Sequence, residues 1–503
     1  MFVAARQKPL CRAGRVAMQS LPNARRTSRT KSRVAALIAV ATIVLAGRGQ
    51  DRPRIEMREA RLGGNGPLVR HGRLHVFEDR AARAGRRIAL DVIVLPALQT
   101  PAAPDPVFVI MGGPGQSATA AANGWANHWM RRERDIVFVD QRGTGGDHRL
   151  SCAVPGDDDD LQGYLDPMFD EAVFRACLAE LSQRADLRHY STPEAMDDLN
   201  DARIALGYEK INLYGGSYGS RAELVYLRRH PQTVRCAIMN SVAPLAFKNP
   251  LYHAKSLQLA LEKIFTICET DPRYRKDYGN LRRELESVLE RLQRNPAPAV
   301  VRHPTTGEPT PVRVSRETFL EALRVIMYVD YRDVPRLIHR ASRGEFDELA
   351  QQGLERNRAL RRSLAFGMLL CVTCAEDLDR ITPAEIERET QGTYAGDVRV
   401  RAQMNICRFW PRSHLPADFG KPVSAETPVL LLSGTLDSVT PPRWGAEAAR
   451  HLPNATHVVA PGSHGLHGPC IDRIIRAFLD DPTRRPDLSC VNDMKLAPFN
   501  PPD

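Results

Sequence analysis

The chain has 503 residues, of which 43% are hydrophobic and 26% are charged, a balance typical of soluble globular proteins. Its formal net charge of +11 is uneven, because residues 1–46 carry nine Lys and Arg and no acid. Subtracting these nine charges leaves +2 for the rest of the chain. This distribution argues against a nucleic-acid-binding protein, and no nucleic-acid partner is expected.

The basic segment has the organisation of an export signal. Its positive region precedes an apolar run at residues 34–46, which is too short to span a bilayer comfortably but suits the core of a secretory signal. We predict that residues 1–46 are a signal peptide cleaved after Ala46 and that the protein is exported, into the periplasm or out of the cell. An uncleaved leader that anchors the chain is the alternative, and Met18 is a second candidate start. No later run of the sequence is long enough to cross a membrane.

Residues 47–245 have the pattern of an alternating α/β core. Apolar and β-branched runs predict strands at residues 73–77, 88–95, 107–111, 135–139, 211–214 and 234–239. The runs at 107–111 and 135–139 are continuous, as in parallel strands that are buried on both faces. Thr192 and Pro193 begin a helix that Gly207 ends. Residues 146–190 interrupt the alternation as a loop-rich excursion.

Residues 246–424 differ from what precedes them, because strand patterns largely disappear. Helical periodicity takes their place at residues 257–267, 281–292, 317–327 and 334–341. Two short extended segments, at 300–302 and 312–314, interrupt the series. The segment has no fixed repeat period, which favours one helical insertion over a repeat array.

Residues 425–503 resume the alternation, with strands at 428–434 and 456–460 and helices near 444–451 and 471–479. Strands that alternate with helices bury a sheet between two helical layers. The sequence thus predicts an α/β fold with a mostly parallel sheet flanked by helices and a helical cap inserted into it. The first part of the core is 47–245, the cap is 246–424 and the second part of the core is 425–503.

A Gly-Gly-Ser-Tyr-Gly sequence at 215–219 follows the strand at 211–214 directly and precedes a helical pattern. This arrangement is typical of a nucleophile elbow, a tight turn that lifts a serine oxygen above the sheet. Glycines are needed there because side chains would collide with the neighbouring strand and helix. The motif alone is a weak signal in a long chain, so the assignment of Ser217 as nucleophile depends on its partners.

A serine hydroxyl becomes nucleophilic when a histidine takes its proton and a carboxylate orients that histidine. Asp437 lies just beyond the strand at 428–434, and His464 lies just beyond the strand at 456–460. The order serine, acid, histidine is the one expected for an elbow of this kind. His467 is the competing base, but His464 is nearer to its strand end, where loops position catalytic groups. Asp437 could otherwise be a turn-stabilising aspartate.

The tetrahedral intermediate of acyl transfer needs two N–H donors aimed at its oxyanion. One is expected from the amide of Tyr218, directly after the nucleophile. The other is expected from the Gly-Gly-Pro-Gly loop at 112–115, where the backbone can approach a substrate closely, and Gly113 is our candidate.

Three glycine-bearing motifs, at 112–115, 140–145 (Asp-Gln-Arg-Gly-Thr-Gly) and 215–219, resemble those of the proline iminopeptidase group of α/β-hydrolases. The chain is more similar to the secreted tripeptidyl aminopeptidases of that group, over roughly residues 60–503. The resemblance implies an α/β-hydrolase fold, removal of short peptides or single residues from free N-termini, and no cofactor. Met111 stands where iminopeptidases usually have histidine, which argues against a strict proline preference.

Ten cysteines are consistent with export to an oxidising compartment, and Cys11 in the leader leaves nine. The pair at 371 and 374 has no second pair at zinc-like spacing, so no metal site is expected. Relatives often carry a second cysteine near the position of Cys268, but none stands here, so Cys268 is expected to be free. Spacing alone does not give disulfide connectivity, but the resemblance implies three bonds. The bonds are Cys152–Cys177, Cys470–Cys490 and Cys374–Cys407, with Cys371 as the alternative partner of Cys407.

An aminopeptidase must hold a protonated α-amine, so a carboxylate of the cap is expected to face the cleft. Glu376 and Asp377 are our candidates, because a disulfide at Cys374 would hold them rigid. The alternative is an ordinary solvated acidic end of a helix.

The sequence therefore predicts an exported serine peptidase that acts on peptides with a free N-terminus. Ser217 is the expected nucleophile, His464 the base and acid, and Asp437 the group that orients it. One alternative is an esterase or lipase-like hydrolase on the same fold. A second is a catalytically silent hydrolase fold used for binding. No stable membrane span is expected in the mature chain unless the leader is retained.

Overall fold

The computed structural model describes residues 53–502. The expected signal peptide, its cleavage site after Ala46, Met18 and Cys11 lie outside the described residues. Within residues 53–502, no helix combines the length and the apolar character that crossing a membrane requires.

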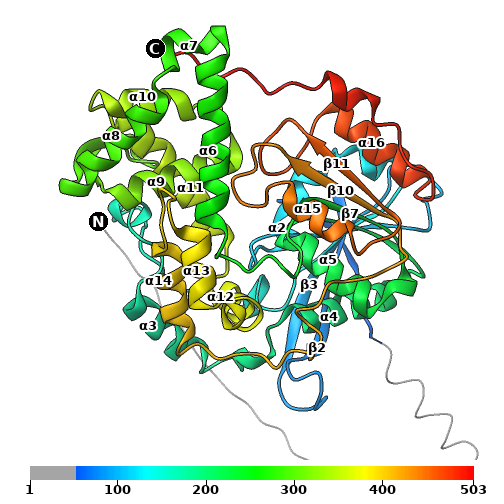
Figure 1. Cartoon of the computed structure of the whole chain (residues 1–503). Coiled ribbons are helices and arrows are strands. Elements are labelled where there is room, and N and C mark those ends of the chain that lie inside the picture. Colours follow the sequence, from blue (N-terminus) through cyan, green and yellow to red (C-terminus); the bar gives the residue numbers. More distant parts are fainter. Residues whose placement is uncertain (1–52, 503) are drawn as a thin grey trace, which may run out of the picture. The chain divides into compact units, whose positions relative to one another are not determined.

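A nine-stranded sheet forms the centre of the α/β core (Figure 1). Its strands β1, β2, β3 and β5 pair antiparallel, and from β5 onward all neighbours are parallel. The mostly parallel sheet is thus confirmed, and every predicted strand is present. In spatial order the strands are β1 (Arg58–Arg61), β2 (Leu68–Phe77), β3 (Arg87–Leu95), β5 (Ile136–Val139), β4 (Val107–Ile110), β6 (Ile211–Ser217), β7 (Val234–Val242), β10 (Val429–Gly434) and β11 (Ala455–Ala460).

The central strands are buried on both faces because successive side chains point to opposite sides. In β4, Phe108 and Ile110 join one hydrophobic cluster, whereas Val107 and Val109 join another. The first cluster includes side chains of α4 (Thr192–Leu206), α5 (Tyr218–Arg229) and α15 (Arg443–Ala449). The second includes those of α2 (Ala118–Ala121) and α16 (Pro469–Asp480). This burial explains why the strands read as continuous apolar runs.

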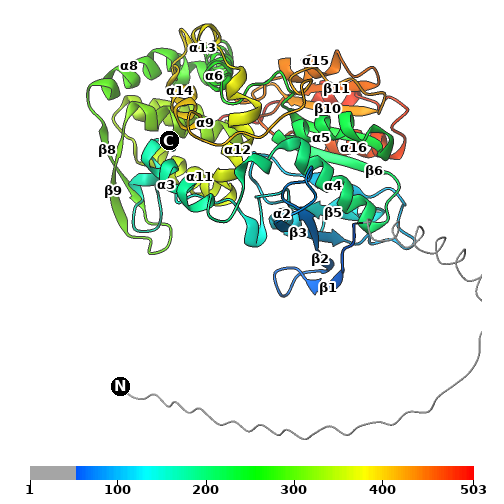
Figure 2. The same ribbon diagram turned by 90° about the horizontal axis from the view of Figure 1, so that it is seen from below.

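The segment between β7 and β10 is mainly helical and lies beside the sheet in both views (Figures 1 and 2). Much of it shares a separate hydrophobic cluster, to which α8 contributes leucines and a valine at helical spacing. The two extended segments form a hairpin. The elements are α6 (His253–Thr270), α7 (Pro272–Tyr278), α8 (Leu281–Arg294), β8 (Ala297–Arg302), β9 (Pro309–Val314), α9 (Arg316–Val329), α10 (Val334–Ser342), α11 (Asp347–Ser363), α12 (Phe366–Glu376), α13 (Pro383–Thr390) and α14 (Val398–Cys407).

Packing crosses the boundaries that the sequence suggested for core and cap. Leu161 and Tyr164 of the excursion before α3 (Glu171–Leu181) belong to the cap cluster, as does Phe499 near the C-terminus. Arg361 of α11 donates to the carbonyl of Gly163 at 2.6 Å. Segments from all three parts of the chain therefore share the hydrophobic cluster of the cap. The division into 47–245, 246–424 and 425–503 remains our proposal for the domains.

Three disulfides join the pairs that the family resemblance implied, with Cys374 rather than Cys371 as the partner of Cys407. Cys374–Cys407 links α12 to α14 across the base of the cap. The described cysteines that remain free are Cys236, Cys268 and Cys371, and all are buried. Burial raises the pKa of each of these thiols to about 12, so they stay protonated and unreactive at neutral pH.

Candidate active site

The elbow around Ser217 has the strained geometry that the motif predicts. Strand β6 ends at Ser217 and helix α5 begins at Tyr218, and the Ser217 backbone has φ 57° and ψ −124°. A non-glycine residue adopts positive φ only where its surroundings enforce it. Gly219 leaves room for this turn, since a Cβ there would lie 2.3 Å from the carbonyl oxygen of Ile110. The turn leaves Ser217 partly exposed at the C-terminal end of β6.

Asp437 and His464 meet in the loops that follow β10 and β11. The Asp437 carboxylate lies 2.9 Å from Nδ1 of His464. The amides of Val439 and Thr440 donate to its other oxygen, each at 2.8 Å. The Thr440 hydroxyl donates at 2.9 Å to the oxygen that faces His464. Burial pushes the Asp437 pKa upward, but His464 and these amides outweigh it and lower the pKa below its ordinary value. The carboxylate is therefore ionised and fixed in orientation beside the imidazole.

His467, the competing base, lies elsewhere. It is exposed, and its Nδ1 lies 3.0 Å from the carbonyl oxygen of Gly465 in its own loop. Of the two candidate histidines, the structure brings His464 to Asp437.

Two polar residues at the end of β7 hold the histidine loop, and sequence reasoning assigned them no role. The Asn240 side chain donates to the carbonyl of Leu466 at 2.8 Å and accepts from its amide at 2.9 Å. The Ser241 hydroxyl accepts from the amide of Gly465 at 2.8 Å. Buried polar side chains at the end of an otherwise apolar strand were the signal that could have revealed them.

The glycine loop at 112–115 lies directly against the elbow. A Cβ on Gly112 would lie 3.4 Å from Cβ of Ser217. The cap holds the loop from the other side, because the amide of Ala365 donates to the carbonyl of Gly115 at 2.9 Å. A side chain on Gly115 would collide with Ala365, since a Cβ on Gly115 would lie 2.7 Å from the carbonyl oxygen of Ala365. Core and cap together therefore fix the backbone of this loop.

The two expected oxyanion donors come from the glycine loop and from the residue directly after the serine. Gly113 has φ 109°, a conformation that favours glycine. Tyr218 is buried, and its hydroxyl lies 2.7 Å from the Thr192 hydroxyl and donates to Gln141 at 3.3 Å. These bonds anchor the first turn of α5. The donor roles of the Gly113 and Tyr218 amides remain our proposal.

The motif at 140–145 supports the site rather than lining it. Asp140 accepts from the Ser117 hydroxyl at 2.8 Å and from the Thr119 amide at 2.9 Å, which fixes the chain after the glycine loop. Arg142 is fully buried and pairs with Asp198 of α4 at 2.7 Å. The motif thus ties the loops at the end of β5 to their neighbours.

A cap side chain that the sequence analysis did not identify reaches the reaction centre. Tyr328 of α9 stacks on the His464 ring, with ring centroids 4.3 Å apart. Its hydroxyl lies near the Ser217 side chain. Burial raises the pKa of the Tyr328 phenol, so it stays protonated at neutral pH.

A cavity of about 380 Å³ opens between core and cap at this point. Gly113, Tyr218 and Tyr328 line it, so it includes the surroundings of the elbow. No Asp or Glu is among the described residues that line it, whereas four arginines are: Arg221, Arg324, Arg356 and Arg399. Within residues 53–502, no group of three or more His, Cys, Asp or Glu side chains is arranged to hold a metal ion.

Glu376 and Asp377 do not face this cavity, which corrects the expectation from the sequence. Both are fully buried at the end of α12. Glu376 accepts from the Thr192 amide at 2.6 Å and from its hydroxyl at 2.8 Å. Asp377 pairs with Arg221 at 2.8 Å. Their oxygens are used within the protein because the end of α12 packs against the start of α4 and against α5, so they cannot receive a substrate amine.

Two family models match the chain: the α/β hydrolase fold over residues 105–267 and TAP-like protein over residues 376–490. The serine protease Hip1 of Mycobacterium tuberculosis is 24% identical over 439 residues, covering 79% of this chain and 83% of its own. The tripeptidyl aminopeptidase of Streptomyces coelicolor is 24% identical over 432 residues, covering 75% of each chain. The proline iminopeptidase of Neisseria gonorrhoeae is 27% identical over 137 residues, covering 27% of this chain and 32% of its own.

Fold and sequence similarity together define the class of protein, a serine hydrolase with the α/β-hydrolase fold. Within that class, the chain is similar to peptidases of the α/β-hydrolase fold.

Proposed function

We propose that the protein is an exported serine aminopeptidase that releases short peptides or single residues from free N-termini. The observation that carries the proposal is the contact between Asp437 and His464, 2.9 Å long, in loops beside the strained elbow of Ser217. A buried, ionised carboxylate on Nδ1 leaves Nε2 of the imidazole as the base.

In this mechanism Ser217 Oγ attacks the carbonyl carbon of the scissile bond while His464 takes the hydroxyl proton. Asp437 stabilises the imidazolium that forms. The amides of Gly113 and Tyr218 donate to the oxyanion. His464 then passes its proton to the departing amine, and the C–N bond breaks. Water attacks the resulting ester with His464 again as base. This step releases the N-terminal fragment as a free acid, and His464 returns the proton to Ser217.

Two observations support action at a chain end. The cavity of about 380 Å³ lies at the low end of the range of about 300–1,000 Å³ typical of small-ligand sites. The cap covers it on the side opposite the sheet, where Tyr328 contacts His464 and Ala365 contacts the glycine loop. A short peptide end fits such a cavity better than a continuous polypeptide. Two relatives are named for removal of N-terminal residues, which agrees with this proposal.

Export is supported by the covalent structure. Three disulfides in one chain are typical of proteins that fold in an oxidising compartment. The leader at 1–46 has the charge and apolar core of a signal peptide.

An esterase is the second candidate, and one observation favours it. The described residues that line the cavity include no carboxylate to pair with a substrate amine. An ester substrate needs no such partner.

The test is a panel of mono-, di- and tripeptide anilides, each with a free and with an acetylated amine. We expect cleavage of the free forms by the wild-type protein and none by Ser217→Ala. A fluorophosphonate probe should label the wild type and not the variant. Cleavage of p-nitrophenyl esters together with failure on all free-amine anilides would replace the aminopeptidase by the esterase. Absence of labelling in the folded wild type would favour the catalytically silent alternative.

A further inference from the structure

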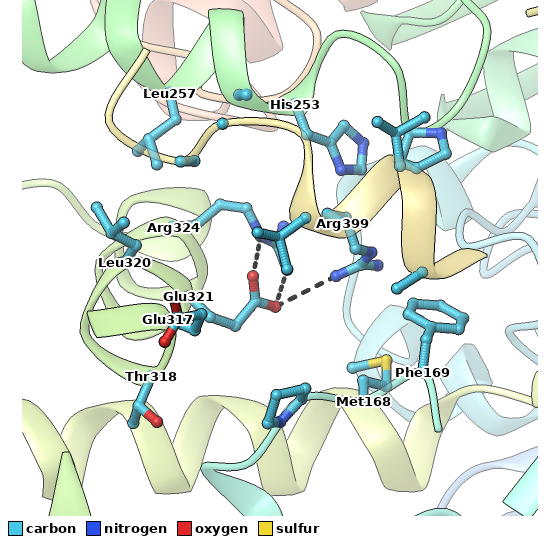
Figure 3. Close-up of a pocket in the computed structure, with 18 of the residues that line it drawn as sticks. Met168, Phe169, His253, Leu257, Glu317, Thr318, Leu320, Glu321, Arg324 and Arg399 are labelled. Atoms are coloured by element: carbon cyan, nitrogen blue, oxygen red, sulfur yellow. Dashed lines mark hydrogen bonds and ion pairs between the residues drawn. The ribbon is translucent and has the colours of Figure 1, made fainter. Parts of the chain in front are cut away.

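A charged cluster divides the main cavity from a smaller one of about 120 Å³. His253, Arg324 and Arg399 line both cavities. Figure 3 shows the two arginines directed at the carboxylate of Glu321, which lines the smaller cavity. Arg324 donates to Glu321 from Nε at 2.7 Å and a second time from Nη2, whereas Arg399 approaches it only to 3.4 Å.

The cluster carries one net positive charge at neutral pH. Burial raises the pKa of Glu321, but Arg324 and Arg399 outweigh it and hold the pKa at about 2. Burial, together with the same two arginines, lowers the pKa of His253 well below its usual range, so this histidine is neutral. Burial lowers the pKa of Arg399 to about 10, which still leaves it charged. One carboxylate therefore faces two guanidinium groups.

Part of the hydrogen-bonding capacity of the cluster is unused. Among the described residues, neither Nε of Arg399 nor Nδ1 of His253 has a hydrogen-bond partner, although both atoms are buried. The Arg399 guanidinium lies over the Phe169 ring, 4.6 Å from its centroid, which holds it in place. Buried polar atoms without a partner cost free energy unless a ligand or water satisfies them.

Glu321 is unsuited to a substrate amine. Arg324 already donates to both of its oxygens, and Arg399 lies beside it. A third cation would be repelled by the two arginines more strongly than one carboxylate attracts it. Arg356 also lines the main cavity and adds to its positive character, whereas the charge of Arg221 is balanced by Asp377. A negatively charged group is the complementary ligand.

We propose that Arg399, with Arg324 and His253 beside it, forms a subsite for a carboxylate of the substrate. This inference rests on the proposed function, because it names the preferred substrate class of the same cavity. The carboxylate is either an Asp or Glu side chain or the free C-terminus of a short peptide. Apolar side chains of the smaller cavity, among them Met168 and Leu257, lie beside the cluster and can pack against the methylene groups of such a ligand (Figure 3).

Binding to Ser217→Ala tests the subsite independently of turnover. Calorimetry would compare tripeptide amides that carry Glu or Gln at the first, second or third residue. A second arm would compare the free acid of a neutral tripeptide with its amide. We expect at least about tenfold tighter binding of the acidic member in one pair, the order of effect of a hydrogen bond to a charged group. Equal affinities in every pair would overturn the proposal.

Variants on α14 identify the residue responsible. Arg399→Gln leaves Glu321 paired with Arg324, and Arg399→Lys keeps the charge. Arg401→Gln is the matched control, because Arg401 lies on the same helix, is 60% exposed and pairs with Asp397. We expect Arg399→Gln to bind the acidic peptide and its amide with nearly equal affinity. Arg399→Lys should keep part of the wild-type preference for the acidic peptide, and Arg401→Gln should keep all of it. A preference for the acidic peptide as large in Arg399→Gln as in wild type would overturn the proposal.

Turnover separates this inference from the proposed function. If the wild type cleaves no anilide but Ser217→Ala binds the acidic peptides in an Arg399-dependent way, the aminopeptidase fails and the subsite stands. If free-amine anilides are cleaved with no preference for acidic residues and no such binding is measured, the subsite fails and the aminopeptidase stands.

Discussion

Tyr328 of the cap stacks on His464 of the core, with ring centroids 4.3 Å apart and ring planes inclined by 27°. The hydroxyl of the same side chain lies near Ser217. One cap residue therefore contacts both groups that the proposed mechanism uses for proton transfer. Any movement of α9 relative to the sheet would change the surroundings of the imidazole.

Two substitutions at Tyr328 separate its ring from its hydroxyl. Tyr328→Phe keeps the stack on His464, and we expect its kcat/KM to stay within about threefold of wild type. Tyr328→Leu removes the aromatic face, and we expect kcat to fall by about two- to tenfold, because aromatic contacts of this kind contribute about 0.5–1.5 kcal/mol.

The rate of fluorophosphonate labelling is the measurement that checks this, since it reports on Ser217 without peptide recognition. Equal labelling rates in Tyr328→Leu and wild type would restrict Tyr328 to a role in substrate binding.

The two histidines of the loop after β11 should differ sharply. We expect His464→Asn to lower kcat/KM by about 10³-fold or more, because the serine loses its base. His467→Asn should stay within about twofold, since His467 is exposed and contacts only its own loop. Kinetics on one anilide or ester substrate, with circular dichroism to verify folding, compares the pair. A larger loss in His467→Asn would reverse the assignment of the base.

Asn240 should act on catalysis through the loop that it clamps. Its side chain makes two hydrogen bonds to Leu466, two residues beyond His464. We expect Asn240→Ala to reduce kcat by about 10- to 100-fold with little change in KM, because misplacement of a catalytic group by about 1 Å has an effect of this order.

The matched control is Asn212→Ala. Asn212 is a buried asparagine on the neighbouring strand β6, and its side chain donates to Asp105 rather than to the histidine loop. Both variants should lose stability in thermal unfolding, but only Asn240→Ala should lose kcat. An equal loss of kcat in both would indicate a general effect of destabilisation.

Glu376 should affect stability in a pH-dependent way. Burial raises its pKa from 4.5 to about 7, although Arg221 and Thr192 oppose the shift. The folded state therefore binds more protons than the unfolded chain between these values, and the free energy of unfolding falls as pH rises through this window. Complete passage through it corresponds to about 3 kcal/mol.

Glu376→Gln removes this proton equilibrium and can still accept from the Thr192 hydroxyl. We expect its stability relative to wild type to increase between pH 5 and pH 8, measured by chemical denaturation at both values. Glu387 lies on the exposed face of α13, and Glu387→Gln should differ from wild type in free energy of unfolding by the same amount at both pH values. A constant difference for Glu376→Gln as well would mean that Glu376 is ionised throughout.

Local pattern was sufficient to predict every strand of the sheet except β1, the elbow and the order of the candidate catalytic residues. Continuous apolar runs such as 107–111 carry this information because both faces of a central parallel strand are buried. Gly219 was identifiable for a steric reason, since a turn this tight excludes a side chain. The motif at 140–145 was equally visible, but its sequence did not reveal that Asp140 and Arg142 bind neighbouring segments rather than substrate.

The sequence by itself thus determined the α/β pattern and the local geometry around Ser217, because both follow from hydrophobic periodicity and backbone sterics over a few residues. Only the tertiary structure decided what the cap contributes. Glu376 and Asp377 became interior ion-pair and hydrogen-bonding residues, while Tyr328 and Arg399 reached the cavity. Such outcomes depend on how helices far apart in the chain pack against the sheet. A charged residue on a helix has the same local sequence pattern whether its neighbour in space is water, an arginine or a substrate.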